Sequence, residues 1–243
     1  MVTVPVYRDV APEFVHSLLR LHIACSASGI DLKYQSTMNP QGFMARNICF
    51  ASFLDSDCSH CLMVDSDMGF GHHNLTRLLQ TGKPFIGCPG PTKAYNWDAI
   101  KQASTEPDPV PYGLRYAVTL LDDHATPHDG FAPVKYFGLC FTLIHRFALE
   151  AIISRFDFLR CSYTAVDASN SLLPCDHVYN LCWPTVSDTG GYIEPDHTLC
   201  DRWRAVGGEV WADLTSDLTH TGPHTFRGDM GLQLFGKSIK DCL

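Results

Sequence analysis

Two aspartates one residue apart, Asp65 and Asp67, directly follow the apolar run His60–Val64. Ionised carboxylates at the edge of a core are costly unless something pairs with them. In an extended chain the side chains at i and i+2 point the same way, so these two are expected to face one spot. Their hard oxygens suit Mg²⁺ or Mn²⁺, which also take phosphate oxygens. From the tripeptide alone, a turn that caps the next segment is the alternative.

Four other positions could contribute to such a site. Arg46 lies on a predicted helix and could bind a diphosphate through two hydrogen bonds, although a solvated helix arginine fits the pattern as well. Asp196 begins another helix, where an acid either complements the helix dipole or serves as a general base. His220 is a candidate third metal ligand only alongside the aspartates, because the chain holds 12 histidines. Pro5, taken alone, indicates only the end of a strand.

The pair Cys58 and Cys61 forms a CxxC pattern, which suggests zinc or redox chemistry. Cys61 begins a predicted buried strand, and no second CxxC exists, so structural cysteines are the favoured interpretation. The chain has 11 cysteines without framework spacing. An odd, scattered set in a chain of this length indicates reduced thiols and a reducing compartment.

The elements that place these residues follow from hydrophobic periodicity. In the first 90 residues, strand and helix patterns alternate, which predicts an α/β fold with a parallel, doubly wound sheet. Ligands of such sheets bind beyond the carboxyl ends of the strands, where the aspartate pair falls. The predicted strands are Val2–Tyr7, Asp31–Ser36, Cys61–Val64 and Phe85–Cys88; the predicted helices follow Pro12 and Asn39-Pro40 and cover Asn74–Gln80.

The second half is less regular, and no linker divides it from the first, so we expect one domain over residues 1–243. A long loop is predicted for Gly90–Pro111 and a loop-rich region for Ser162–Gly191. The predicted strands are Leu114–Leu121, Tyr136–Ile144 and Glu209–Ala212, and the predicted helices are Arg146–Phe156 and Asp196–Val206.

Charge and composition limit the classes of partner that this protein could bind. The 18 basic and 26 acidic side chains give a net charge of −8, which predicts no general attraction for nucleic acid or anionic membranes. A protein of this charge that handles phosphates needs a local device such as a metal ion. No run of eighteen or more apolar residues predicts a membrane span, and the first residues, MVTVPVYRDV, lack the features of a signal peptide.

Taken in order, seven motifs resemble GT-A-fold glycosyltransferases of the broad family-two type, in the subgroup seen in bacteria, phages and large DNA viruses. The DxD motif alone is weak, but the ordered set spans nearly the whole chain. The matching segments are Val4–Tyr7, the "ARN" helix at Met44–Asn47, the DxD at Val64–Asp67, Cys88–Trp97, Gly138–Arg146, the acidic "RW" helix at Asp196–Trp203, and the "HxG" at Thr219–Gly222.

The resemblance implies a GT-A fold, with a nucleotide-sugar-binding half at 1–100 and an acceptor-binding and catalytic half at 101–243. It implies a cytoplasmic enzyme (in the host cytoplasm if viral) that uses Mn²⁺ or Mg²⁺. The enzyme would transfer one sugar, with inversion, from a nucleotide-diphosphate sugar, with UDP favoured, to a hydroxyl of a glycan or glycoprotein.

The same resemblance assigns roles to single residues. Asp65, Asp67 and His220 would hold the metal, and Asp196 would be the base, with Glu194 as the other candidate because the usual Glu-Asp pair reads Pro195-Asp196 here. The donor-binding residues would be Pro5, Val6, Tyr7, Arg46, Ser66, Lys93, Gly138 and His224, and the acceptor-binding residues Trp97 and Trp203.

The sequence also departs from the family at two places, and two other functions stand as alternatives. The second strand ends in Gln35-Ser36-Thr37, without the usual acid for the nucleotide base, and Leu199 stands where processive members carry Gln. A phosphotransferase that uses DxD carries it on the first strand, followed by Gly rather than Met68. A catalytically silent sugar-nucleotide or glycan-binding module is the non-enzyme rival, and UDP binding without turnover would favour it.

Overall fold

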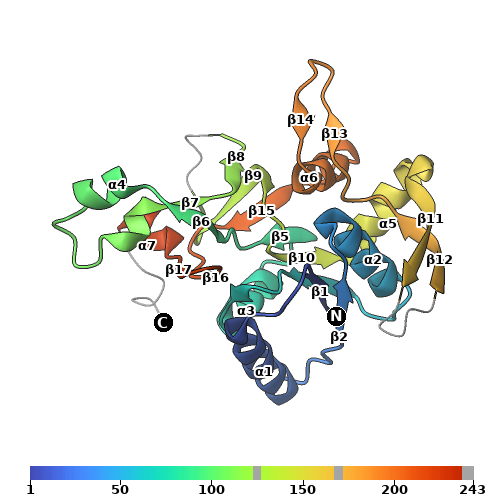
Figure 1. Ribbon diagram of the computed structural model, residues 1–243, viewed down its shortest axis with the longest axis horizontal. Helices are drawn as coiled ribbons and strands as arrows, with labels where there is room; N and C mark the ends of the chain where they lie inside the picture. The colour runs from blue at the N-terminus through green and yellow to red at the C-terminus, as the bar shows by residue number, and fades with distance from the viewer. Residues whose placement is uncertain (123–126, 167–171, 237–243) are drawn as a thin grey trace.

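A central sheet organises the molecule (Figure 1). The computed structural model describes the chain apart from residues 123–126, 167–171 and 237–243. In the described part this sheet has eight strands in the order β2-β1-β3-β10-β5-β15-β9-β8. The strands are β1 (Val2–Val6), β2 (Tyr34–Met38), β3 (His60–Val64), β5 (Phe85–Gly87), β8 (Val118–Leu120), β9 (Phe131–Phe137), β10 (Phe141–His145) and β15 (Val210–Asp213).

The sheet is mixed but mostly parallel, as the α/β prediction requires. β1 pairs in parallel with β2 and β3, and β15 pairs in parallel with β5. β10 runs against both β3 and β5, and β9 runs against β15 and β8. Only β9 and β10 among these strands therefore oppose the common direction, and the carboxyl ends of β1, β3, β5 and β15 share one edge.

Two hydrophobic cores cover the two faces of the sheet. Helices α1 (Pro12–Ala27) and α3 (His72–Gln80) enclose one core, and α2 (Gly42–Leu54), α5 (Arg146–Arg155) and α6 (Pro195–Ala205) enclose the other.

Strand β3 shows how the residue alternation sorts side chains between these cores. Cys61 and Met63 enter the core under α2, while Leu62 and Val64 enter the core under α1. Each fully buried side chain of this size contributes about 1.5–3 kcal/mol. The next position on the α2 face is Asp65, so the alternation that builds the core also aims this carboxylate toward α2.

The predicted β-α-β-α-β-α-β order of the first half is confirmed, with boundaries shifted by a few residues. The second half required corrections. The expected strand Tyr136–Ile144 is the end of β9, a turn, and the start of β10. The Ser162–Gly191 region, expected to be loop-rich, contains most of a hairpin of β11 (Arg160–Val166) and β12 (Leu172–Tyr179), and then β13 (Thr185–Val186), which pairs with β14 (Tyr192–Ile193) just after the region.

The Gly90–Pro111 region, expected to be a loop, also holds structure, namely β6 (Pro91–Tyr95) and α4 (Trp97–Gln102), followed by a 3-10 turn, Val110–Gly113. β6 pairs with β7 (Leu114–Tyr116). The predicted strand Leu114–Leu121 is divided into β7 and β8, and the strand predicted at Glu209–Ala212 is β15.

A small three-stranded sheet lies beside the carboxyl edge. It consists of β17 (Thr225–Arg227), β16 (Thr219–Thr221) and β4 (Met68–Gly69), and α7 (Met230–Phe235) follows. No helix within the described residues is long and apolar enough to cross a membrane. Nine of the cysteines are free thiols, and most of these nine are buried.

Candidate active site

A cavity of about 180 Å³ opens at the carboxyl ends of β1 and β3. A larger neighbouring cavity of about 700 Å³ shares Tyr7, Ser66 and Asp67 with it and adds Lys93. Eight residues that the sequence singled out line the smaller cavity: Pro5, Val6, Tyr7, Arg46, Asp65, Ser66, Asp67 and His220. The fold thus gathers residues from four separate segments at the edge where ligands of such sheets bind.

The two aspartates do not face one spot, because the chain turns between them. The Met68 N–H donates to the Asp65 carbonyl at 3.1 Å, so residues 65–68 form a turn rather than continuing the strand. The expectation from an extended chain was wrong here. Asp65 points toward α2 and α6, whereas Asp67 points toward β16, and both still border the same cavity.

Arg46 on α2 joins Asp65 to Asp196 at the start of α6. Its Nη2 donates to both oxygens of Asp65, at 2.9 and 3.0 Å, and its Nη1 donates to Asp196 Oδ1 at 3.1 Å. Its side chain is only 15% exposed. Burial alone would lower the pKa of Arg46, but the two carboxylates outweigh it and raise the pKa, so this cation stays charged.

Burial raises the pKa of Asp65, against the opposing effect of Arg46 and with help from the nearby charges of Asp196 and Asp67. Asp196 is held from a second side, where the Leu139 N–H donates to its Oδ2 at 3.1 Å. Gly138 precedes that amide, and a Cβ there would lie 3.8 Å from Asp196 Oδ2 and 3.3 Å from the Ala117 Cβ. The β9–β10 corner therefore fixes the carboxylate through its backbone.

Asp67 faces His220 and Lys93. His220 Nε2 lies 3.2 Å from Asp67 Oδ1, and Lys93 Nζ contacts Asp67 Oδ2. The other ring nitrogen of His220, Nδ1, lies 2.8 Å from the Pro91 carbonyl, which can only accept a hydrogen bond. Nδ1 therefore carries a proton, which fixes the tautomer that a metal bound through Nε2 would require.

Asp67 remains ionised in this setting. Burial alone would raise its pKa, but the hydrogen bonds and charges of His220 and Lys93 outweigh burial and lower the pKa. A carboxylate oxygen and an imidazole nitrogen thus meet at the mouth of the cavity.

The donor atoms of Asp67 and His220 suit a divalent cation. Two adjacent ligands of an octahedral ion with bonds near 2.1 Å lie roughly 3 Å apart, close to the 3.2 Å found between Asp67 Oδ1 and His220 Nε2. No group of three or more His, Cys, Asp or Glu side chains in the described part of the chain is arranged to hold a metal. The protein would supply two ligands here and leave the remaining positions to water or phosphate oxygens.

The remaining predicted donor-binding residues lie around this centre. Ser66 is buried and donates to the Asp9 carbonyl at 3.0 Å, so it fixes the loop after β1. Tyr7 is exposed at the cavity mouth. His224 on the loop before β17 lies 3.0 Å from the Tyr95 hydroxyl through its Nε2.

The two predicted acceptor residues differ. Trp97 is 63% exposed and its ring centroid lies 5.2 Å from that of Tyr95. Trp203 is a core side chain, 4% exposed, and its indole N–H donates to the Glu209 carbonyl at 2.9 Å. A direct acceptor contact by Trp203 does not fit this placement. Glu194 is exposed just before α6 and has no side-chain hydrogen bond in the cap, whereas Asp196 reaches Arg46.

Sequence reasoning missed several contributors. The Pro91 carbonyl, the Leu139 amide and Tyr95 all lie in segments read as a loop or as an unbroken strand. The period-two spacing of Pro91, Lys93 and Tyr95 was the available signal for a strand beside the site. Cys61 is fully buried and 3.2 Å from the Thr3 hydroxyl, consistent with the structural interpretation of the CxxC pair.

Comparison with solved structures includes a loose likeness of fold. A solved structure, the crystal structure of A197 from STIV, is similar over 91% of this chain and 84% of its own, with 13% identity and a TM-score of 0.46. At that level it carries no argument about function. No family model and no curated protein matches the sequence.

Proposed function

We propose that this protein is a metal-dependent glycosyltransferase that moves one sugar from a nucleotide-diphosphate sugar, with UDP favoured, to a hydroxyl of a glycan or glycoprotein. One observation carries the proposal: Asp67 Oδ1 and His220 Nε2 face each other across 3.2 Å beside a cavity at the carboxyl edge of the sheet. A carboxylate and an imidazole with a fixed tautomer form an incomplete ligand set, which a diphosphate would complete.

Each residue then has a distinct task. Asp67 and His220 would hold Mn²⁺ or Mg²⁺, which would neutralise charge on the leaving diphosphate. Lys93, already in contact with Asp67, places a second positive charge beside the same position. Asp65 has both oxygens on Arg46, so we assign it to holding that arginine rather than the metal.

Asp196 is the base in this proposal. Arg46 and the Leu139 amide hold its two oxygens in one orientation, and each carboxylate oxygen keeps a further lone pair for an acceptor hydroxyl. A base at Asp196 would favour in-line attack by the acceptor hydroxyl on the donor sugar, with inversion. Arg46, whose Nη groups both serve carboxylates, acts as a positioning residue rather than a phosphate ligand.

The acceptor would approach over the aromatic group of Tyr95, Trp97, His224 and Phe226. The ring centroids of Trp97, His224 and Phe226 lie 4.8–5.9 Å from that of Tyr95. Tyr95 follows Lys93 by two residues on β6, so the group adjoins the proposed metal. Trp97 and His224 are the exposed members of the group, and exposed aromatic rings beside a polar site suit the apolar face of a sugar ring.

The test is a thermal-shift screen of UDP- and GDP-sugars with and without Mn²⁺, followed by transfer assays on the donors that bind. A ligand selective for the folded state raises the melting temperature. We expect Asp67→Asn and His220→Asn to abolish the Mn²⁺-dependent shift and to lower turnover at least about 100-fold. Asp196→Asn should keep the shift but lower transfer by about 10²–10⁴-fold.

Asp98→Asn, at an exposed carboxylate on α4, is the matched control and should behave as the parent. Donor binding without turnover across a broad acceptor panel would replace the enzyme with a silent binding module. Unchanged turnover in Asp67→Asn would overturn the metal role.

A further inference from the structure

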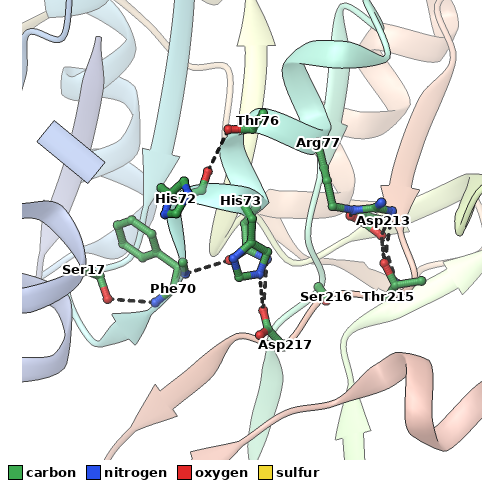
Figure 2. A network of polar contacts seen from close by, with 12 residues as sticks. Ser17, Phe70, His72, His73, Thr76, Arg77, Asp213, Thr215, Ser216 and Asp217 are labelled. Carbon is green, nitrogen blue, oxygen red and sulfur yellow. Dashed lines mark hydrogen bonds and ion pairs between the residues drawn. The ribbon is translucent and has the colours of Figure 1, made fainter. Parts of the chain in front are cut away.

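Helix α3 contacts the segment between β15 and β16 through two separate polar clamps (Figure 2). In the first, Arg77 reaches Asp213 at the end of β15; in the second, His73 reaches Asp217. Neither clamp lines the cavities described above. The second ends three residues before His220, one of the two proposed metal ligands.

Strand β16 needs such support because it lies outside the central sheet. It has three residues, Thr219–Thr221, and pairs with the two residues of β4 and with β17. Its register places His220 opposite Met68, and the Thr221 N–H donates to the Asp67 carbonyl at 2.8 Å. A two-residue pairing gives few hydrogen bonds, so the segments flanking it must fix its position.

Asp217 is fixed by the first turn of α3. His73 Nε2 lies 3.1 Å from Asp217 Oδ1, and Asn74 Nδ2 donates to the same oxygen at 3.2 Å. The Asp217 side chain is nearly buried, so these bonds are shielded from water. Asn74 in turn accepts from the Gly71 N–H at 2.8 Å, which anchors the start of the helix.

Gly71 makes room for the His73 ring. A Cβ built on Gly71 would lie 2.3 Å from His73 Cε1 and Nδ1. The backbone of Gly71 has a φ of −94°, which any residue adopts, so a side chain is excluded here only by the ring. The His73 ring therefore lies against the backbone of Gly71 when it contacts Asp217, and a side chain at position 71 would displace it.

The Asp213 clamp has a different character. Asp213 is fully buried, and it accepts from Arg77 Nε at 2.8 Å and from the Thr215 hydroxyl at 2.6 Å. It secures the end of a central strand, so its loss would affect folding as a whole. The Asp217 clamp is closer to β16, and its aspartate side chain is 11% exposed, against 0% for Asp213.

We infer that His73 and Asn74 are positioning residues for His220: through Asp217 they fix β16 against the loop that carries Asp67. Helix α3 begins only four residues after Met68, so one short unit holds both sides of the Asp67–His220 pair. The inference rests on the proposed function for its purpose, but the positioning itself can be measured without any turnover.

The first measurement is amide hydrogen exchange in the parent, His73→Ala and His72→Ala. We expect the Thr221 amide, which bonds to Asp67, to exchange about tenfold faster in His73→Ala, because the clamp restrains its strand. The Cys88 amide, bonded to the Phe141 carbonyl in the central sheet, should not change. His72 is exposed and adjacent, so His72→Ala is the matched control.

The second measurement is Mn²⁺ affinity in the presence of UDP, by titration calorimetry. Loss of an outer-shell partner typically weakens metal binding about 10–100-fold, and we expect that loss in His73→Ala and Asp217→Asn. His73→Gln, which keeps a donor, should recover part of it.

Gly71→Ala supplies a variant that keeps both residues of the clamp but displaces the His73 ring. It should weaken Mn²⁺ binding and speed Thr221 exchange in the parent, but add nothing in His73→Ala, where the ring is gone. Equal effects of Gly71→Ala in both backgrounds, or unchanged Thr221 exchange in His73→Ala, would overturn the inference. A parent protein that binds no Mn²⁺ with UDP would instead overturn the proposed function, while the exchange result would still decide the positioning.

Discussion

Arg46 lies between the carboxylates of Asp65 and Asp196, which would otherwise repel each other. Asp65 and Asp196 come from different elements, and the charge of Asp196 raises the pKa of Asp65. The guanidinium separates them with three hydrogen bonds. Breaking such a buried pair by removing one partner leaves an uncompensated charge, which costs far more than the intact pair contributes.

At this scale we predict that Arg46→Gln lowers the free energy of unfolding by about 3 kcal/mol, because two carboxylates lose their cation. Urea denaturation at neutral pH measures it. Arg8→Gln is the matched control: Arg8 also pairs with an aspartate, Asp9, but its side chain is 80% exposed, and a change below about 0.5 kcal/mol is expected. Equal losses in the two variants would show that Arg46 is not a buried bridge.

Among the elements, β10 decides how the second half joins the first. It inserts between β3 and β5 and brings Phe141 and Leu143 into the core under α1. The close approach depends on Gly87 in β5. A Cβ there would lie 2.3 Å from the Phe137 ring and 2.7 Å from the Phe141 carbonyl.

We therefore predict that Gly87→Ala destabilises the fold by about 1–3 kcal/mol, since the backbone of β10 cannot yield as a flexible side chain would. Gly42→Ala, at the start of α2 with no atom within 4 Å of the added Cβ, should change stability by less than about 0.5 kcal/mol. Thermal unfolding of the two variants makes the comparison. A loss confined to Gly42→Ala would contradict the packing argument.

The elements also show what the sequence alone could predict. Local patterns were enough for α1, α2 and the strands before residue 90, because the helices carry periodic apolar positions and β1, β3 and β5 are short, mostly apolar runs that are buried on both faces. The insertion of β10 was not predictable, since pairing between residues such as Leu143 and Leu62 depends on contacts far apart in the chain. The hairpin containing β11 was missed because its polar, mixed composition resembles a loop.

The same limit applies to the candidate site. The strand order and the family resemblance were enough to predict that Asp67, His220 and Arg46 lie at one edge of the sheet. They could not predict the turn at Ser66 or the separate partners of Asp65 and Asp67, because these depend on the position of α2 and of β16. Tertiary contacts, rather than local propensity, decide which way each carboxylate points.

For the whole molecule, the two edges of the sheet carry different polar chemistry. The carboxyl edge holds the proposed metal and base, while the opposite edge holds His60 at the start of β3 beside His145 at the end of β10. Their ring centroids are 4.7 Å apart and nearly perpendicular. Burial, and then the charge of His145, lowers the pKa of His60 below its usual 6.5.

This edge should make the fold sensitive to acid independently of the candidate site. Because the pKa of His60 is lower in the folded than in the unfolded chain, the unfolded chain binds more protons between the two values, and stability rises with pH there. The stabilisation is complete above 6.5 and is lost as the pH falls through the folded value. Urea denaturation from about pH 7.5 to about pH 5 should show this loss in the parent and a smaller loss in His60→Gln. His22→Gln, at an exposed histidine of α1, should follow the parent curve; if it flattened the curve as much as His60→Gln, the acid response would not come from the His60–His145 edge.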